Sequence, residues 1–248
     1  MKFFLFTAFL LVINQLHAQV LIHAHNDYEK PEPLFNAIRE KAFAIEADVY
    51  LVNGQLAVAH DRKDIDSART LTSLYLKPID SMMRAHKGFV TADKDYQPVL
   101  VVDIKADGEK VLAELVRLII AYPRIFDGSA HQKPLYILVS GDRGPIAKWK
   151  EYPASVRFDG RPTELYDTAA LSKVVTVSES YGKYYRDNKL NKDSLIAMIG
   201  RAHSQKKLVR LWGAPDFPAT WTAFQSLGID IINTDKVTEC RRILSAKK

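Results

Sequence analysis

Two carboxylates on one side of a predicted strand give the first indication of chemistry in this sequence. Residues 43–50, FAIEADVY, have the apolar and β-branched composition of a strand. Because side chains alternate along a strand, Glu46 and Asp48 lie on the same side, together with Ala44 and Tyr50. Neighbouring carboxylates repel each other and are costly to bury unless something neutralises them. We expect a divalent cation in this role; the alternative is an ion pair with a nearby Lys or Arg.

A further predicted strand, VLVVDIK at 99–105, adds a third acid. Asp103 and Lys105 share one side of this strand and lie at its end. Asp103 would complete a carboxylate-rich site for Ca²⁺ or Mg²⁺, the hard cations that prefer oxygen ligands. Lys105 either pairs with Asp103 or holds a substrate phosphate as a point charge.

Histidines accompany these acids. The first predicted strand ends in HAHNDY, so His23 and His25 share a face and Asn26 offers a carbonyl oxygen beside them. His60 follows the segment LAVA. A lone histidine is usually structural, but histidines beside a carboxylate cluster suit general acid and base work, because their pKa is near neutral.

The elements that must position these residues alternate between strand and helix. Eight strands are predicted, at 20–25, 43–50, 99–105, 134–140, 155–160, 173–180, 207–213 and 230–235, with helical periodicity at 33–42, 108–122, 192–205 and 218–228. This alternation predicts an α/β fold, and the length favours a single (β/α)8 TIM-type barrel. A doubly wound sheet is the alternative, but no glycine-rich fingerprint follows the first strand.

Two features refine this barrel. Residues 51–60 are predicted to form a hairpin extension with Asn53-Gly54 as its turn. The reactive residue types fall mainly at the ends of the predicted strands, and barrel enzymes carry their chemistry at the C-terminal ends of the strands.

The first residues have the pattern of a secretory leader. Lys2 precedes an apolar run from Phe3 to Ile13, and Ala18 follows before the next segment. This predicts a signal peptide at 1–18, a barrel domain at 19–248 and a secreted or periplasmic location. The apolar run is shorter than the ~20 residues of a membrane-spanning helix; the alternative is a buried N-terminal helix. Cys240 is the single cysteine, which excludes an internal disulfide and a CxxC metal site.

The charge composition indicates which kinds of molecule this protein would bind. A formal net charge of +6 suits an anionic substrate or an anionic membrane surface. Nucleic acid is not predicted, because the basic residues are scattered among acids. Residues 179–189, ESYGKYYRDNK, are aromatic and basic. They either cover a sugar or inositol phosphate, lie against lipid head groups, or form an ordinary solvated loop.

Taken together, these segments resemble a known superfamily. HAHNDY, FAIEADVYLVNGQLAVAHD and VVDIK are similar to the signature of the phosphatidylinositol-phospholipase-C-like phosphodiesterases, which include the glycerophosphodiester phosphodiesterases. The opening H-x-H-N-D-Y and the E-A-D-V segment resemble the branch named after the altered-inheritance-of-mitochondria protein 6. LVRLWGAPD and LGIDIINTD look like the last two strands of that family, so the resemblance spans most of the chain after the leader.

The resemblance implies roles for individual residues. Two histidines, His25 and His60, would be catalytic. Glu46, Asp48 and Asp103 would bind the metal, with Asn26 as a further ligand. Glycerophosphodiesterases typically have Glu at the position of Asp103 and an HRG opening that this chain lacks, so His23 is the alternative to His25. We favour His25 because the adjacent asparagine matches the phospholipase pattern.

Further residues are assigned to the substrate. Lys105 and Arg210 would add positive charge to a phosphate pocket. Trp212 shares the side of Arg210 in KLVRLWG and is expected either to contact substrate or to pack in the core. Asp235 and Glu179 are strand-end acids for which a substrate role and a structural role are likewise both open.

The sequence thus predicts a secreted, metal-dependent phosphodiesterase with a small-molecule phosphodiester or a lipid head group as substrate. Two alternatives remain open. One is a Zn²⁺ hydrolase of the amidohydrolase or phosphatase type, which needs further histidines at later strand ends. The other is a barrel that binds a phosphate ligand without turnover. No oligomeric state is predicted.

Overall fold

The computed structural model describes residues 20–128 and 133–246. The predicted leader at 1–18 lies outside these residues. Within the described part of the chain, no helix is both long and apolar enough to cross a membrane.

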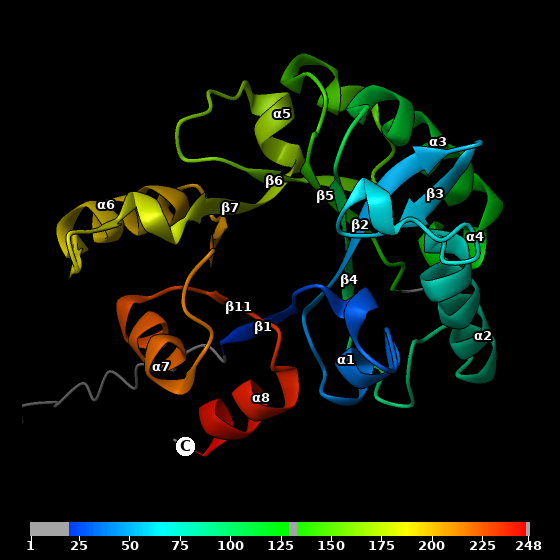
Figure 1. Ribbon diagram of the computed structural model, residues 1–248. Helices are drawn as coiled ribbons and strands as arrows, with labels where there is room; N and C mark the ends of the chain where they lie inside the picture. The colour runs from blue at the N-terminus through cyan, green and yellow to red at the C-terminus, as the bar shows by residue number, and fades with distance from the viewer. Residues whose placement is uncertain (1–19, 129–132, 247–248) are drawn as a thin grey trace, which may run out of the picture.

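Eight parallel strands close into a barrel (Figure 1). They are β1 (Leu21–Ala24), β2 (Ala44–Val52), β4 (Val99–Ile104), β5 (Ile137–Gly141), β6 (Val156–Gly160), β7 (Val174–Ser180), β10 (Leu208–Trp212) and β11 (Ile231–Thr234). Neighbouring strands follow the order β1-β11-β10-β7-β6-β5-β4-β2, and pairing of β1 with β2 completes the ring. The predicted (β/α)8 barrel is confirmed.

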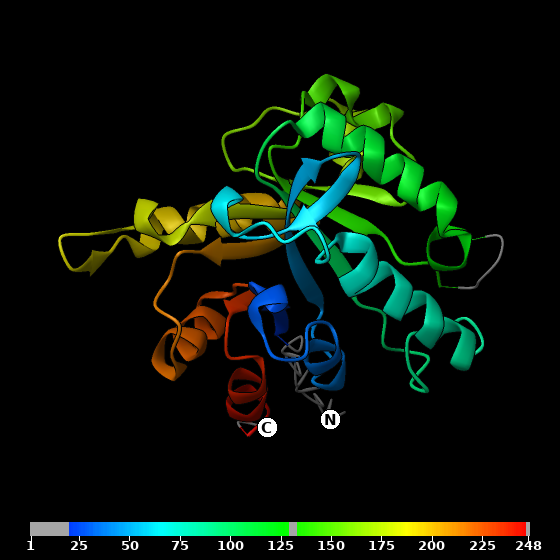
Figure 2. The ribbon, with the colours of Figure 1, turned by 45° about the vertical axis from the view of Figure 1, so that its right-hand side comes forward.

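Helices surround the strands, as Figures 1 and 2 show. They are α1 (Phe35–Arg39), α2 (Lys77–Ala85), α3 (Gly108–Ala121), α4 (Pro123–Phe126), α5 (Thr168–Lys173), α6 (Lys192–Ser204), α7 (Pro218–Leu227) and α8 (Val237–Ser245). Short 3-10 turns lie at Asp27–Glu29, Arg62–Asp64, Ile146–Glu151 and Tyr181–Lys183, and a π-helical segment at Thr72–Leu76 leads into α2. The outward strand residues Ile45, Ala47 and Val49 are buried beneath this helical layer, as the alternation of FAIEADVY requires.

The barrel interior changes character along its axis. At the N-terminal end of the strands a small apolar cluster fills the interior, made by Ala44, Val99, Val101 and Leu138. Further along β2 and β4 the inward positions are occupied by acids instead. The interior is thus apolar at its floor and charged towards its mouth.

The hairpin after β2 forms as predicted. Strand β3 (Gln55–Val58) pairs antiparallel with β2, and Asn53 and Gly54 have φ angles of 49° and 75°. Two consecutive left-handed residues are the requirement of a type I′ turn, which Asn-Gly satisfies with little strain. The returning strand leads to Ala59, whose amide donates to the carbonyl oxygen of Asp48 at 3.2 Å, so His60 is placed at the mouth.

A second hairpin lies in the segment between β7 and α6, which sequence patterning identified only as a loop. Strands β8 (Tyr185–Arg186) and β9 (Lys189–Leu190) are two residues each, and their turn has Asp187 and Asn188 at φ 49° and 57°. This hairpin projects from the body of the barrel (Figure 2).

One buried ion pair crosses the barrel interior. Arg210 on β10 donates from Nη2 to Asp159 Oδ2 on β6 at 3.0 Å, and Ser178 Oγ donates to Asp159 Oδ1 at 2.6 Å. Burial opposes ionisation of Asp159, but the charges of Arg210 and Arg161 and the hydroxyl hydrogen bonds outweigh it and lower its pKa to about 2. Asp159 is therefore a carboxylate held inside the barrel by Arg210 of β10 and by Arg161, which follows β6.

Replacing Asp159 by Asn should destabilise the protein by about 3–5 kcal/mol, because it leaves the buried Arg210 without its counter-ion. Denaturant titration monitored by circular dichroism measures this. The exposed Asp187→Asn is the control and should change stability by less than about 0.5 kcal/mol.

The difference in stability between the native chain and Asp159→Asn should also depend on pH. A carboxyl with a folded pKa of about 2, against about 3.9 when unfolded, contributes stability that is present above pH ~4 and is lost as pH falls towards 2. The stability gap between the native chain and Asp159→Asn should narrow over this range. A gap that is small at pH 7, or independent of pH, would contradict this account of the pair.

Candidate active site

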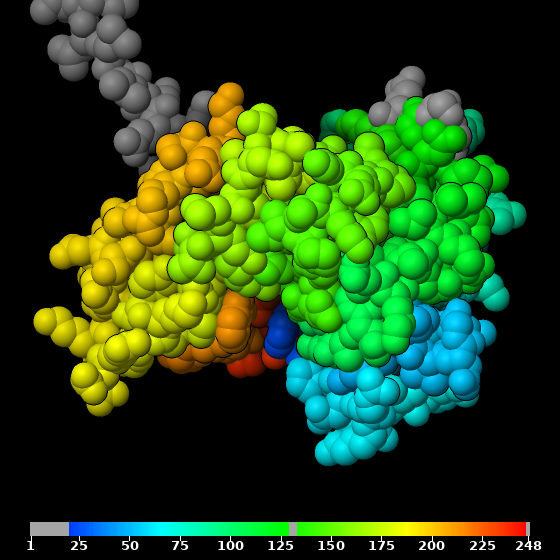
Figure 3. All heavy atoms as spheres, turned by 90° about the horizontal axis from the view of Figure 1, so that it is seen from above, coloured from blue at the N-terminus to red at the C-terminus, as the bar shows by residue number. Residues whose placement is uncertain are grey.

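Three carboxylates converge at the C-terminal ends of β2 and β4. Parallel pairing places Asp48 directly opposite Asp103, and Glu46 lies one inward position deeper on β2. One oxygen from each of the three lies within 4.8 Å of the other two. Figure 3 shows a notch in the surface on this side of the molecule, with atoms from the start of the described chain, in blue, at its base.

Asp48 is the most heavily contacted of the three. Its Oδ2 accepts from Lys105 Nζ at 2.7 Å and from the Tyr28 hydroxyl at 2.9 Å, and lies 3.0 Å from His60 Nδ1. Its Oδ1 is buried and has no hydrogen-bond partner within the described residues. Burial and the charge of Glu46 raise the pKa of Asp48 in spite of Lys105.

This donor set fits a hard divalent cation. A buried carboxylate oxygen without a partner is costly, and here it belongs to a cluster of three carboxylates. Oxygen ligands from carboxylates are those that Ca²⁺ and Mg²⁺ prefer.

Lys105 already offsets part of the negative charge. Its Nζ lies 2.7 Å from Asp48 Oδ2 and 3.2 Å from Asp103 Oδ1, and the side chain is 24% exposed. Burial alone would lower its pKa, but the two aspartates outweigh burial and raise it. The ion pair between Asp103 and Lys105, one of the two roles expected from sequence, is thus present, and Asp48 shares it.

His25, at the end of β1, is held by an acid from the end of β11. Its Nδ1 lies 3.1 Å from Asp235 Oδ1, and its Nε2 lies 4.0 Å from Glu46 Oε2. Burial alone would lower the pKa of His25, but the hydrogen bond to Asp235 and the charges of Glu46 and Asp235 raise it. The His25 side chain is one-third exposed, so a ligand in the mouth can reach it.

His23 lies deeper and has a different environment. It is buried, and its Nε2 lies 3.0 Å from Glu46 Oε2. Burial and the charge of Arg210 lower the pKa of His23. Burial opposes ionisation of Glu46, but His23 and Arg210 outweigh it and lower the Glu46 pKa. His23 therefore contacts the carboxylate cluster from within the barrel, whereas His25 contacts it from the mouth.

His60 repeats the arrangement of His25 on the other side of the cluster. Its Nδ1 lies 3.0 Å from Asp48 Oδ2, and its side chain is about half exposed. In the part of the chain that the structure describes, no hydrogen bond engages its Nε2. Each of the two histidines thus rests Nδ1 against an aspartate and leaves Nε2 available for proton transfer.

Asn26 and Tyr28 connect β1 to this cluster. Asn26 has a left-handed backbone, with φ 46°, and its Oδ1 accepts from the Tyr28 hydroxyl at 3.2 Å. The same hydroxyl lies against Asp48 and 3.4 Å from His60 Nδ1. Tyr28 was missed by sequence reasoning, although it ends the HAHNDY motif.

The residues assigned to substrate differ in their exposure. Arg210 is buried, and its Nε, Nη1 and Nη2 donate to Ser178, Asn233 and Asp159. Trp212 lies at the end of β10, and 42% of it is exposed. Arg210 thus acts on interior charges, and Trp212 is open to a ligand.

The remaining described histidines lie away from the mouth. His86 follows α2, and His203 on α6 pairs with Asp230 at 2.7 Å. Neither supplies the strand-end ligand that the Zn²⁺ alternative needs.

Comparison with known proteins identifies a matching family model and similar curated proteins. A family model described as the AIM6-like phosphodiesterase domain matches residues 13–143. Altered inheritance of mitochondria protein 6 of Eremothecium gossypii is 27% identical over 262 residues, covering 86% of this chain and 67% of that protein. A homolog from Arthroderma benhamiae is 26% identical over 260 residues, covering 89% and 82%.

Solved structures share the fold. A glycerophosphodiester phosphodiesterase from Parabacteroides distasonis superposes with a TM-score of 0.58 at 17% identity, covering 92% of this chain and 97% of that one. A glycerophosphodiester phosphodiesterase from Agrobacterium tumefaciens gives 0.51 at 13% identity, covering 90% and 99%. At these identities the likeness establishes the barrel fold.

Replacing Asp235 by Asn should lower the pKa of His25, because the substitution removes the hydrogen bond and charge that raise it. NMR titration of the histidine ring protons in the presence of EDTA measures this directly. Asp230→Asn is the matched control, since Asp230 pairs with His203 and leaves His25 unaffected. An unchanged His25 titration in Asp235→Asn would contradict the pairing.

Proposed function

Because the chain belongs to the family of AIM6-like phosphodiesterase domains, we propose that it is a secreted, metal-dependent phosphodiesterase that cleaves a glycerophosphodiester or a phospholipid head-group phosphodiester. One observation carries the proposal. Two partly exposed histidines, His25 and His60, flank a three-carboxylate cluster, and each has Nδ1 against an aspartate.

The carboxylates are the metal site of this proposal. Glu46, Asp48 and Asp103 would hold the cation, with Asn26 as the further ligand that the family resemblance implies. A bound Ca²⁺ or Mg²⁺ would stabilise the charge that develops on the phosphate oxygens.

The two histidines divide the proton transfers. Nε2 of one histidine takes the proton from the attacking hydroxyl as its oxygen bonds to phosphorus. The bond from phosphorus to the leaving oxygen breaks, and Nε2 of the other histidine delivers a proton to that oxygen. Asp235 and Asp48 hold the rings by Nδ1, so that each Nε2 keeps its direction through the reaction.

The attacking hydroxyl belongs to water or to the substrate itself. Water gives a phosphomonoester, so the protein acts as a hydrolase; a neighbouring substrate hydroxyl gives a cyclic phosphate, so it acts as a lyase. Phosphorus NMR of the products distinguishes the two.

Secretion is part of the proposal and rests on the sequence pattern of residues 1–18, with a basic start, an apolar run and a small residue at the end. N-terminal sequencing of protein recovered outside the cytoplasm tests it. An uncleaved chain retained in the cytoplasm would contradict it.

His25→Ala and His60→Ala should each reduce turnover by about 10²–10⁴-fold while leaving the fold intact, because each removes one proton-transfer group. Turnover is measured on a panel from glycerophosphodiesters to phosphatidylinositol and sphingomyelin, with Ca²⁺, Mg²⁺, Zn²⁺ or chelator. His86→Ala is the control, since His86 lies on the helical layer. Wild-type turnover in both His25→Ala and His60→Ala would refute the catalytic assignment. Absence of turnover by the native chain with every metal would favour the binding-barrel alternative.

Ca²⁺ or Mg²⁺ should bind and stabilise the native chain. An ion present at about 100 times its Kd adds about 2.7 kcal/mol, which raises Tm by about 5–10 °C in a domain of this size. Asp103→Asn should lose most of this shift, because it removes one carboxylate of the cluster. Asp107→Asn, which changes an acid four residues away that pairs with Lys110, should keep it. Equal shifts in both variants, measured by calorimetry, would place the ion elsewhere.

A further inference from the structure

Exposed apolar side chains gather at one end of this barrel. Among the described residues, seven large apolar side chains are exposed, and five of them lie between a strand and the next helix or at the boundary of such a segment. These five are Phe35, Leu165, Tyr185, Trp212 and Phe217. In a parallel barrel all such segments emerge at the end that carries the active site. These five exposed side chains therefore lie at the same end of the barrel as the candidate site.

Three of the five, Tyr185, Trp212 and Phe217, lie at the end of β10 or on the segments that follow the neighbouring strands β7 and β10 and are called here the aromatic edge. Strands β7 and β10 are neighbours, and their register places Trp212 opposite Ser180. The next residue, Tyr181, stacks on Tyr185 with ring centroids 5.2 Å apart. Tyr181 also contacts Phe224 of α7 at 5.7 Å, and Phe217 stands at the start of α7. The aromatic edge thus joins the segments that follow β7 and β10.

Basic side chains project beside the aromatic edge. The segment between β7 and α6 contains Lys183, Arg186 and Lys189 against one acid, Asp187, and Lys192 follows it at the start of α6. Within the described residues, no other strand-to-helix segment has a net positive formal charge. We call residues 183–192 the basic hairpin.

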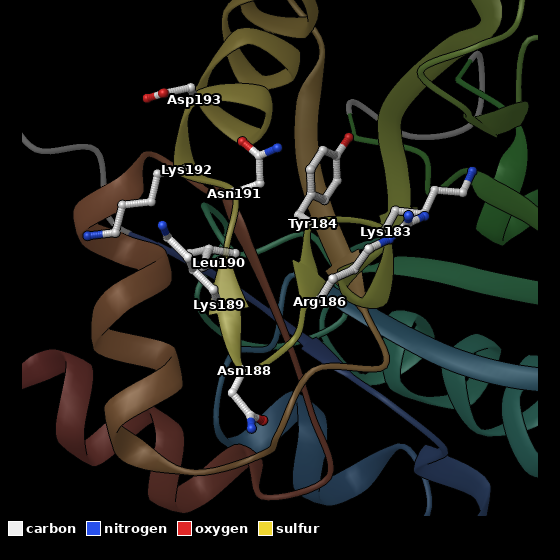
Figure 4. Close-up of a pocket in the computed structure, with 9 residues that line it drawn as sticks. All are labelled: Lys183, Tyr184, Arg186, Asn188, Lys189, Leu190, Asn191, Lys192 and Asp193. Carbon is white, nitrogen blue, oxygen red and sulfur yellow. The ribbon is translucent and has the colours of Figure 1, made fainter.

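Most of the cations of the basic hairpin are unpaired. Lys183 lies 2.7 Å from Glu179, whereas the exposed side chains of Arg186, Lys189 and Lys192 have no carboxylate partner in the part of the chain described. A hollow of about 900 Å³ lies against the hairpin. Figure 4 shows the cationic groups of Lys189 and Lys192 extending from one side of it and those of Arg186 and Lys183 from the other.

We propose that the aromatic edge and the basic hairpin dock this protein on a bilayer that contains anionic lipid. Aromatic side chains are favoured at the boundary between lipid and water, since one part of each is apolar and another part polar. Free cations a few residues away meet the negative charge of the head groups. An apolar group flanked by unpaired cations matches such a boundary in both chemistry and charge.

Docking in this way turns the mouth of the barrel towards the lipid. The aromatic edge and the carboxylate cluster lie at the same ends of the strands, so a head-group phosphodiester would face His25 and His60. This consequence rests on the proposed function and selects the lipid among its substrates. The docking itself requires no turnover.

Vesicle flotation of the purified native chain tests the docking. The protein should float with vesicles of phosphatidylcholine and phosphatidylglycerol, and much less with phosphatidylcholine alone. Each basic residue near an anionic surface contributes roughly fivefold, so Arg186→Gln, Lys189→Gln and Lys192→Gln together should weaken binding by about 100-fold. High salt should weaken the native chain in the same direction.

The control for this triple variant removes three cations elsewhere. Lys87, Lys206 and Arg242 are exposed and lie after α2, after α6 and within α8. Their replacement by Gln changes net charge equally and should leave binding within about twofold of the native chain. Equal losses in both triple variants would show a net-charge effect and overturn the proposed surface.

The aromatic edge has its own test. Tyr185→Ser with Phe217→Ser should weaken vesicle binding by about tenfold or more, because both side chains lose their apolar contact with the lipid boundary. Ile120→Ser, which removes a more exposed apolar side chain on α3, should have no effect. Native binding by the aromatic variant would overturn the role of this edge.

Activity separates this proposal from the proposed function. The basic triple variant should lose turnover of lipid in anionic vesicles and keep turnover of a soluble glycerophosphodiester. A native chain that binds vesicles and cleaves no phosphodiester refutes the proposed function alone. A native chain that cleaves soluble substrate and floats with neither kind of vesicle refutes the docking alone.

Discussion

The crowding of negative charge at the barrel mouth is the constraint on which the rest of the site depends. Glu46, Asp48 and Asp103 are placed together by strand register alone, since parallel pairing of β2 and β4 leaves their side chains no other direction. Three carboxylates cannot share a partly buried space without compensation. Lys105 supplies part of the compensating positive charge through its contact with Asp48. Asp48 Oδ1 is buried and has no hydrogen-bond partner within the described residues, so the compensation is incomplete there.

Further support comes from deeper in the barrel. His23 contacts Glu46, and Arg210 lies between that pair and Asp159. Breaking such a buried pair by removing one partner costs several kcal/mol, so the interior charges are mutually dependent. Arg210, which the sequence assigns to the substrate, is buried and donates to Ser178, Asn233 and Asp159. It therefore provides positive potential beneath the carboxylates.

The sequence predicted the features that local patterns determine. It did not predict the pairs of residues that are far apart along the chain. Eight strands, the Asn53-Gly54 hairpin and the inward side of Glu46 and Asp48 follow from composition, turn chemistry and alternation within a few residues. The partnership of Asp159 with Arg210 joins residues 51 positions apart, and that of His25 with Asp235 spans 210. No local pattern encodes such pairs. The β8–β9 hairpin was missed for another reason, because strands of two residues are too short to show alternation.

The long-range pairs show where the site is assembled. β1 lies between β11 and β2, so the first strand closes the ring and places His25 between the last strand and the second. Asp235 then reaches His25 from the last strand, Asp48 reaches His60 from the second, and Tyr28 links β1 to Asp48. If β1 did not pair with β11, the acids on β2 and β4 would stay in place, but Asp235 would no longer orient His25. Closure of the barrel therefore also sets the orientation of His25, one of the two proposed proton-transfer groups.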